Sequence, residues 1–247
     1  MSGFASFFQH LAASGIDLPY FYDSFDAARF WGGLLLTIEL SVVTIAASTL
    51  IGIIGAWMQA SRAGIARAIA NAYVELFRNT PPLVQIYFFY FGMSTLLPTV
   101  QNAYGQQLPL LGGFAWAALS LSLYAGSFNV EIFRSGIEAI PNATSEAAEA
   151  LGFTRMKAYQ HIILPLAIRI CLPALTNNLV NLIKTTTLAY AIAVPELLYV
   201  SGQIWSDRGN VPEMMVTLLV IYLILVGILV AFMRGLERAL KKPGLGT

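Results

Sequence analysis

Long apolar runs constrain this chain more than any other feature. The run from Trp31 to Met58 holds a single charged residue, Glu39, and the run from Met214 to Met233 holds none. Each is long enough for a helix to cross the hydrocarbon core of a bilayer, which takes about 20 residues. Only helices and closed barrels satisfy every backbone polar group in lipid. The runs therefore predict membrane-spanning helices.

The composition agrees with this prediction. Of 247 residues, 57% are hydrophobic and only 11% are charged, which is typical of a protein with several membrane helices. The formal net charge of +1 provides no basic surface for nucleic acid. Residues 1–30 are rich in aromatic and acidic residues and lack the positive region that begins a signal peptide. We expect an interfacial, extracytoplasmic segment there, because aromatic rings favour the headgroup level.

An all-α integral membrane domain is predicted over residues 31–240, followed by a cytoplasmic tail at 241–247. About five transmembrane helices are expected, at 31–58, 73–97, 113–133, 166–201 and 214–233. Prolines 81 and 82 should break the second span, and the fourth is too interrupted for one straight helix.

Short polar loops are expected between these spans at 59–71 and 202–212. Within the spans, Glu75 and Arg78 can form a pair at i,i+3, as can Glu131 and Arg134.

The loop at 138–165 is a polar segment with helical periodicity between two apolar runs. Thr144 or Ser145 is expected to cap a first helix. Gly152 allows a sharp change of direction that a Cβ would resist. A second helix, roughly Arg155 to Ile163, should end at Pro165, which cannot continue the hydrogen-bond ladder. These features predict a helix-turn-helix loop that stands out of the membrane.

The positive charges predict the orientation, because cytoplasmic loops carry an excess of Lys and Arg. Of the 14 cations, eleven fall on the side of the 138–165 loop, two on the other side, and Lys184 lies within a span. The eleven are Arg62, Arg67, Arg78, Arg134, Arg155, Lys157, Arg169, Arg234, Arg238, Lys241 and Lys242. The two are Arg29 and Arg208. This distribution predicts a cytoplasmic loop and C-terminus and an N-terminus outside.

The chain offers little material for catalysis. It contains no GxxxxGK[ST] phosphate loop, so the usual ATP cradle is excluded. His10 and His161 are the only histidines, too few for a metal cluster, and no nucleophilic triad is plausible. We expect a chain that is not an enzyme and has no metal site or cofactor of its own.

A polar cluster interrupts the apolar fourth span. Asn177, Asn181 and Lys184 recur at i, i+4 and i+7 and so share one helical face, with Asn178 and Thr185 beside it. A charge at the bilayer centre is disfavoured by roughly 2.5–3.5 kcal/mol on insertion scales, so Lys184 should face a wet cavity or a partner. A cation among amides and hydroxyls suits the carboxylate of a small zwitterion. Hydrogen bonding between helices is the other interpretation, since Asn and Thr commonly serve it, and the residues leave both open.

The polar loop resembles the EAA loop of ABC-transporter permeases. The matched residues are Glu146, Ala147, Ala148, Gly152, Ile162, Leu164 and Pro165. The resemblance implies the type I importer permease fold, with a coupling loop that docks on a separate ATPase dimer. That partner would bind ATP and Mg. It also implies a second permease, identical or paralogous, an extracytoplasmic binding protein, and a location in the bacterial inner membrane.

Within that family the chain resembles the polar amino-acid uptake class, on the run ELFRNTPPLVQ at 75–85, the run from Leu175 to Leu188, and the VPEL segment after it. The resemblance implies a substrate pocket at Lys184, Asn178, Asn181 and Thr185. Asn178 stands where the class usually has Gln or Glu, and Thr185 where it has Asp. The loss of both carboxylates favours a neutral or acidic amino acid over a basic one. We expect an ATP-driven importer that works by alternating access; the alternative is an ion-coupled secondary amino-acid transporter that acts without an ATPase.

Overall fold

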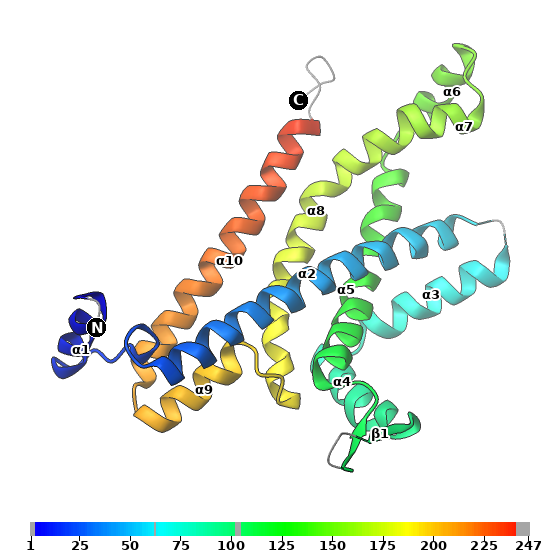
Figure 1. Cartoon of the computed structure of the whole chain (residues 1–247). Coiled ribbons are helices and arrows are strands. Elements are labelled where there is room, and N and C mark those ends of the chain that lie inside the picture. The colour runs from blue at the N-terminus through cyan, green and yellow to red at the C-terminus, as the bar shows by residue number, and fades with distance from the viewer. Residues whose placement is uncertain (1–2, 62, 102–104, 241–247) are drawn as a thin grey trace. The chain divides into compact units, whose positions relative to one another are not determined.

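The computed structural model describes residues 3–61, 63–101 and 105–240. In these ranges the chain is mostly helical, with one two-stranded antiparallel hairpin (Figure 1). Two compact units each draw on several stretches of chain, and they are described separately. The predicted tail at 241–247 lies outside the described residues, as do the cations Arg62, Lys241 and Lys242.

The elements follow one another along the chain in a simple order. The α-helices are α1 (Gly3–Ala13), α2 (Ser24–Ala60), α3 (Gly64–Arg78), α4 (Pro82–Tyr87), α5 (Gly113–Glu138), α6 (Asn142–Ala150), α7 (Arg155–Ala158), α8 (Leu164–Thr185), α9 (Leu197–Arg208) and α10 (Val211–Leu240). The 3₁₀ segments are η1 (Pro19–Phe21), η3 (Met93–Leu96) and η5 (Thr186–Ile192), and the π-helical ones are η2 (Phe88–Gly92) and η4 (Tyr159–Ile163). Strands β1 (Thr99–Gln101) and β2 (Gln107–Pro109) pair with Val100 opposite Leu108.

Three helical stretches of the described chain are long and apolar enough to cross a membrane: Ser24–Ala60, Arg155–Ile192 and Val211–Leu240. The first and third of these contain the predicted first and fifth spans, and the second covers the predicted fourth span, 166–201, only as far as Ile192. Helix α5 covers the predicted third span over 26 residues. The all-α membrane fold is confirmed, and the count of five crossings stays a prediction.

Two predicted loops are wrong. The loop at 59–71 is mostly helical, because α3 begins at Gly64 and buries Ala70 and Val74 along one face of an amphipathic helix. The loop at 202–212 is helical as far as Arg208, where Gly209 ends α9 at a φ of 73°. In both cases a few buried apolar side chains hold a polar segment in a helix.

Two predicted interruptions are confirmed. Helix α3 ends at Arg78 and α4 begins at Pro82, so the prolines separate two helices. In the fourth span the α-helix ends at Thr185 and is followed by 3₁₀ turns as far as Ile192. Ala193 then adopts a left-handed φ of 56°.

Unit 1 comprises Met1–Thr44, Pro82–Leu121 and Ile183–Val226. Its core joins the start of α2 to α9 and α10 through Tyr20, Phe30, Leu197, Ile204, Met214 and Leu218. The rings of Tyr20 and Phe30 stack at 4.1 Å, and the Tyr20 hydroxyl lies 2.8 Å from Thr217 Oγ1.

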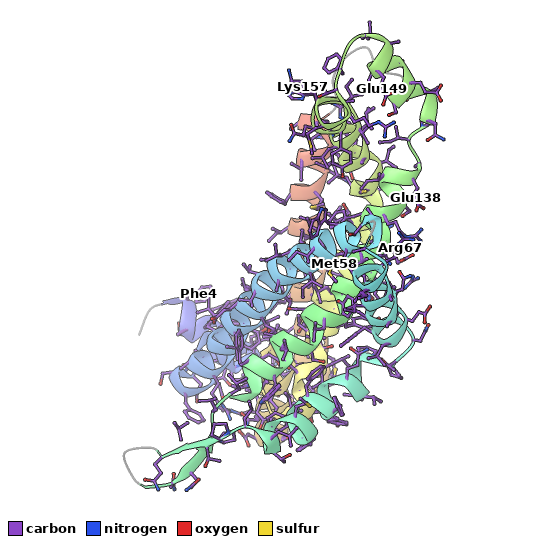
Figure 2. The ribbon with its side chains drawn as sticks, turned by 90° about the vertical axis from the view of Figure 1, so that its right-hand side faces the viewer. Phe4, Met58, Arg67, Glu138, Glu149 and Lys157 are labelled. Atoms are coloured by element: carbon purple, nitrogen blue, oxygen red, sulfur yellow. The ribbon has the colours of Figure 1, made fainter. Side chains whose placement is uncertain are left out.

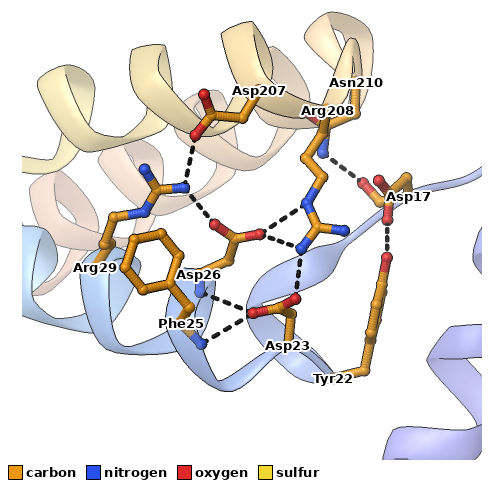
Figure 3. A network of polar contacts seen from close by, with 9 residues as sticks. All are labelled: Asp17, Tyr22, Asp23, Phe25, Asp26, Arg29, Asp207, Arg208 and Asn210. Carbon is orange, nitrogen blue, oxygen red and sulfur yellow. Dashed lines mark hydrogen bonds and ion pairs between the residues drawn. The ribbon is translucent and has the colours of Figure 1, made fainter.

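An ion network borders this core (Figure 3). The Asp26 carboxylate is only 1% exposed and accepts from Arg29 and from Arg208 Nε at 2.9 Å. Asp23 accepts from the backbone N–H groups of Phe25 and Asp26, and from Arg208 at 2.5 Å. The backbone N–H of Asp26, followed by Arg208, lowers the pKa of Asp23 below its ordinary value. The network fixes the end of α9 beside the start of α2.

Unit 2 comprises Ile45–Pro81, Ser122–Leu182 and Gly227–Thr247. Glycines let its helices approach closely. A Cβ on Gly52 would lie 3.1 Å from the backbone of Asn129, and one on Gly126 would lie 2.9 Å from the Tyr73 hydroxyl. That hydroxyl donates to Leu123 O at 2.6 Å. In this unit α2 and α5 therefore approach closely at Gly52 and Gly126, and the Tyr73 side chain of α3 lies directly against α5.

Candidate functional site

The predicted coupling loop folds as two short helices within unit 2. Figure 2 shows Glu149 and Lys157 at one end of this unit, beyond Glu138 at the end of α5. Helix α6 starts at Asn142, earlier than expected, with Pro141 at the N-cap position. The predicted cap at Thr144 or Ser145 is therefore wrong, because the extended backbone of Pro141 already sets the start and Thr144 N–H bonds to its carbonyl.

Gly152 makes the turn between the two helices. Its φ is 85°, in the left-handed region that favours glycine. Around it, Gly152 N–H bonds to Glu149 O and Phe153 N–H bonds to Ala148 O, which satisfies the last carbonyls of α6. The predicted sharp turn is confirmed.

Pro165 does not end the second helix, contrary to the sequence prediction. Helix α7 covers only Arg155–Ala158, and the π-helical segment η4 leads directly into α8, with Pro165 in its first turn. Pro165 has no N–H, so it cannot donate to the preceding turn of this continuous helix. The wider π turn, closed by Leu164 N–H on Tyr159 O, carries the helix past the proline.

One buried residue from each side of the turn holds the loop together. Ala148 of α6 and Ala158 of α7 are 2% and 1% exposed. Arg155 Nε lies 3.2 Å from Glu149 Oε1, an ion pair across the turn with both partners well exposed. Thr154 caps α7 by accepting from Lys157 N–H.

The motif residues Glu146, Ala147, Leu164 and Pro165 are exposed, and Ile162 is half-buried.

The surface of this loop carries apolar side chains that the sequence reading did not single out. Leu151, Phe153 and Met156 surround Gly152 and are exposed by 78%, 37% and 65%. Such residues in an otherwise polar loop are a signal for a protein contact. That signal was present in the sequence as three large apolar residues beside the turn.

A second cluster of polar side chains lies near the C-terminal end of α5, before the loop. Glu131 pairs with Arg134 at 2.8 Å, as predicted. Arg78 also pairs with Glu131, at 3.7 Å, rather than with the predicted Glu75. The packing of α3 beside α5 brings these residues together, and spacing along one helix did not reveal it. Gln59 adds a hydrogen bond to Glu131 and one to Asn71.

The predicted substrate residues lie on α8 but differ in their surroundings. Asn177, Asn181 and Lys184 are exposed and share one face of the helix. Thr185 is half-buried at the end of the helix. Asn178 lies inward: its Nδ2 donates to Ala125 O at 3.0 Å and to Asn129 Oδ1 at 2.8 Å. The structure thus leaves Asn181 and Lys184 accessible and gives Asn178 a partner on α5.

Asn129 is the residue of this group that the sequence reading missed. It is fully buried, and its Nδ2 has no hydrogen-bond partner among the described residues. An asparagine inside the apolar third span, four residues before its end, was the available signal. The described residues contain no group of three His, Cys, Asp or Glu side chains that could hold a metal ion.

Comparison with known proteins gives a consistent result. Residues 48–242 match the family model described as binding-protein-dependent transport system inner membrane component. The chain is 33% identical over 224 residues to the octopine transport system permease protein of Rhizobium radiobacter, covering 87% of this chain and 90% of that protein. It is 31% identical to the probable glutamine ABC transporter permease protein of Bacillus subtilis, covering 92% and 99%.

Solved structures share the fold. A crystal structure of an amino acid ABC transporter with histidines superposes with a TM-score of 0.75 at 25% identity, covering 94% of this chain and 98% of that one. The methionine transporter MetNI in an inward-facing form gives a TM-score of 0.67 at 23% identity. The resemblance seen in the EAA motif is confirmed over most of the chain. The chain therefore belongs to the family of binding-protein-dependent transport system inner membrane components, the permease subunits of ABC transporters, whose ATPase activity resides in a separate subunit.

Proposed function

We propose that this permease imports a polar amino acid, neutral or acidic rather than basic, by alternating access. The observation that carries the proposal is the polar face of α8, where Asn181 and Lys184 are accessible on an otherwise apolar helix. The names of the relatives above, which specify octopine, glutamine and amino acids, support polar amino acids and their derivatives as the solute class. The preference for a neutral or acidic solute rests on the residues at 178 and 185 alone.

Lys184 would bind the carboxylate of the solute. Its side chain is exposed, so no group among the described residues shields it from a ligand. Asn181 lies one turn before it and would supply amide hydrogen bonds, and Thr185 would add a hydroxyl. Asn178 would position α8 through Asn129. The absence of a carboxylate at 178 and 185 favours a solute without a cationic side chain.

The loop centred on Gly152 would couple the permease to the ATPase. Its exposed Leu151, Phe153 and Met156 form a contact surface of the kind that docks in a protein groove. Two permease subunits, identical or paralogous, would each present one loop to the ATPase dimer, and closure of that dimer would open the pathway outward. In this proposal the loop and the C-terminus are cytoplasmic, and an extracytoplasmic binding protein delivers the solute to the other side.

Reconstituted uptake tests the proposal. The tagged chain is purified with its co-purifying subunits, placed in liposomes, and given the binding protein and a radiolabelled amino acid. Uptake should require ATP on the loop side and should not respond to proton or sodium gradients. Uptake driven by an ion gradient alone, by a chain that purifies without an ATPase, would show a secondary transporter instead.

Substitution of Lys184 tests the solute site. Lys184→Met keeps the length of the side chain and removes its charge, so uptake should fall by about tenfold or more while the complex still assembles. Lys184→Arg keeps the charge and should retain part of the activity. Equal uptake by both variants and the wild type would place the solute elsewhere.

A further inference from the structure

A polar cleft of about 360 Å³ lies in unit 1, apart from the exposed face of α8. Its lining comes from Arg29, Tyr190, Tyr199, Gly202, Gln203, Ser206 and Asp207. The volume falls at the lower end of the range of about 300–1,000 Å³ for small-molecule sites. Lys184 and Asn181 are not part of this lining, so the cleft is distinct from the solute site proposed above.

Arg29 gives the cleft a cation with unused donors. Its Nη2 donates both to the buried Asp26 and to Asp207 Oδ2, the latter at 3.0 Å (Figure 3). A guanidinium has five N–H donors. In the part of the chain that the structure describes, both bonds leave from Nη2, and the Nε donor is buried without a partner. The Nη1 donors therefore remain for an anionic oxygen in the cleft.

Asp207 gives the cleft an anion beside that cation. Its side chain is 58% exposed, and Oδ2 alone accepts from Arg29. The Oδ1 atom is left for a donor from a ligand. Arg29 and Asp207 lie side by side, and each keeps polar atoms that are not used in their ion pair. They match a ligand that carries a carboxylate and an ammonium on one carbon atom.

Two aromatic rings and a glycine complete the cleft. Tyr190 and Tyr199 lie with their ring centroids 5.7 Å apart, and Tyr190 is 49% exposed. Tyrosine offers an apolar face and a hydroxyl, which suits a polar side chain of moderate length. A Cβ on Gly202 would make ordinary contacts, 3.5 Å to Trp205 and 3.7 Å to Tyr190, so there is room at this position.

We propose that this cleft binds the zwitterionic backbone of a free α-amino acid, with the carboxylate on Arg29 and the ammonium on Asp207. The ligand side chain would lie along Tyr190 and Tyr199. The identification as an amino acid rests on the proposed function. The cleft then adds a second solute site, on the proposed extracytoplasmic side, before Lys184. The ethanolamine phosphate headgroup of a lipid carries the same pair of charges, and the experiment separates the two.

Binding without the binding protein tests this proposal. The complex with its co-purifying subunits is placed in phosphatidylcholine nanodiscs, and equilibrium binding of radiolabelled L-glutamine and L-glutamate is measured. The Lys184→Met background removes the other site. At least one probe should bind saturably in that background. Asp207→Asn, which keeps the shape, and Gly202→Leu, which fills the cleft, should each weaken binding by about tenfold or more.

The control is Asp17→Asn, which replaces a carboxylate that accepts from the Tyr22 hydroxyl and does not line the cleft, and binding should be unchanged. Two results would overturn the proposal: no saturable binding in the Lys184→Met background, or binding by the Asp207→Asn and Gly202→Leu variants that is as tight as in that background. ATP-driven uptake by the same wild-type preparation distinguishes failure of the cleft proposal from failure of the proposed function. If the wild type shows no uptake, the proposed function is refuted. If uptake is normal and the cleft variants bind as tightly as their background, only the cleft proposal is refuted.

The lipid arm repeats the measurement in nanodiscs that contain phosphatidylethanolamine, with native mass spectrometry of the complex. Amino-acid binding unaffected by this lipid supports the proposal. The opposite result is that the wild type retains a phosphatidylethanolamine molecule, that Gly202→Leu releases this lipid, and that no amino acid displaces it. That result would assign the cleft to a lipid headgroup and overturn the proposal.

Discussion

Asn178 on α8 and Asn129 on α5 are joined by a hydrogen bond of 2.8 Å from the Nδ2 of Asn178 to the Oδ1 of Asn129. The same Nδ2 also reaches the carbonyl of Ala125. Asn129 is fully buried, so this contact joins two helices of unit 2 away from the surface of α5. A residue expected to contact the solute thus has a demonstrable role in packing.

Replacement of Asn178 should lower stability. Asn178→Ala removes the donor to the buried Oδ1 of Asn129, at a cost of about 1–3 kcal/mol for such a group, while Ala125 O keeps its bond within α5. The thermal midpoint of the purified complex in detergent should fall accordingly. Asn177→Ala, one residue away and exposed, is the matched control and should leave the midpoint unchanged. An unchanged midpoint for Asn178→Ala together with impaired uptake would instead show contact with the solute.

Replacement of Gly152 should uncouple transport by the permease from ATP hydrolysis by the ATPase subunit. A Cβ at this position meets nothing within 4 Å, so the whole penalty of Gly152→Val comes from its φ of 85°. Left-handed backbone costs a residue with a Cβ roughly 1–2 kcal/mol, and a β-branched residue is strained most. We expect ATP hydrolysis that no longer responds to loaded binding protein, and reduced uptake. Gly152→Asn, which tolerates this conformation, should behave nearly as the wild type; equal coupling by the valine variant would count against the loop assignment.

Replacement of Gly136 should separate α5 from α8. A Cβ there would collide with Cys171 Sγ and lie 3.1 Å from Ala167 O. Gly136→Ala should therefore destabilise the protein by about 1–3 kcal/mol, the usual cost of overpacking. Adding Cys171→Ala removes the Sγ atom that the new Cβ would meet, so the double variant should regain part of the lost stability. A double-mutant cycle measures this recovery. Gly235→Ala meets no neighbour within 4 Å and serves as the control; a drop in stability as large as that of Gly136→Ala would exclude the packing explanation.

Acid should weaken the ion network through Asp23. Because its pKa is lowered in the folded protein, its stabilising contribution is present above the pKa of the unfolded chain and is lost as pH falls through the folded pKa. Asp23→Ser keeps an oxygen that can cap α2 and removes the charge. The difference in thermal midpoint between this variant and the wild type should shrink as the pH is lowered from 7 toward 3. A difference that is constant over this range would mean that the charge of Asp23 does not contribute.

The sequence by itself determined the membrane class, the family and the position of the helix-turn-helix loop around Gly152. The apolar runs from Trp31 and from Met214 lie inside α2 and α10, because twenty consecutive apolar residues have one stable arrangement in lipid. The turn at Gly152 was predictable for a similar reason, since only a residue without a Cβ adopts its φ at no cost. These are local constraints that each segment carries within its own residues.

Only the tertiary structure decided the partners of the polar residues and the extent of the helices. Arg78 binds Glu131 instead of Glu75, and Asn178 binds Asn129, because helices distant in sequence bring those groups together. Helix α9 continues to Arg208 because Ile204 is buried in the core of unit 1, and α8 passes Pro165 because a π turn precedes it. The free energy of each contact depends on atoms from both segments, so a pattern within one segment cannot specify it.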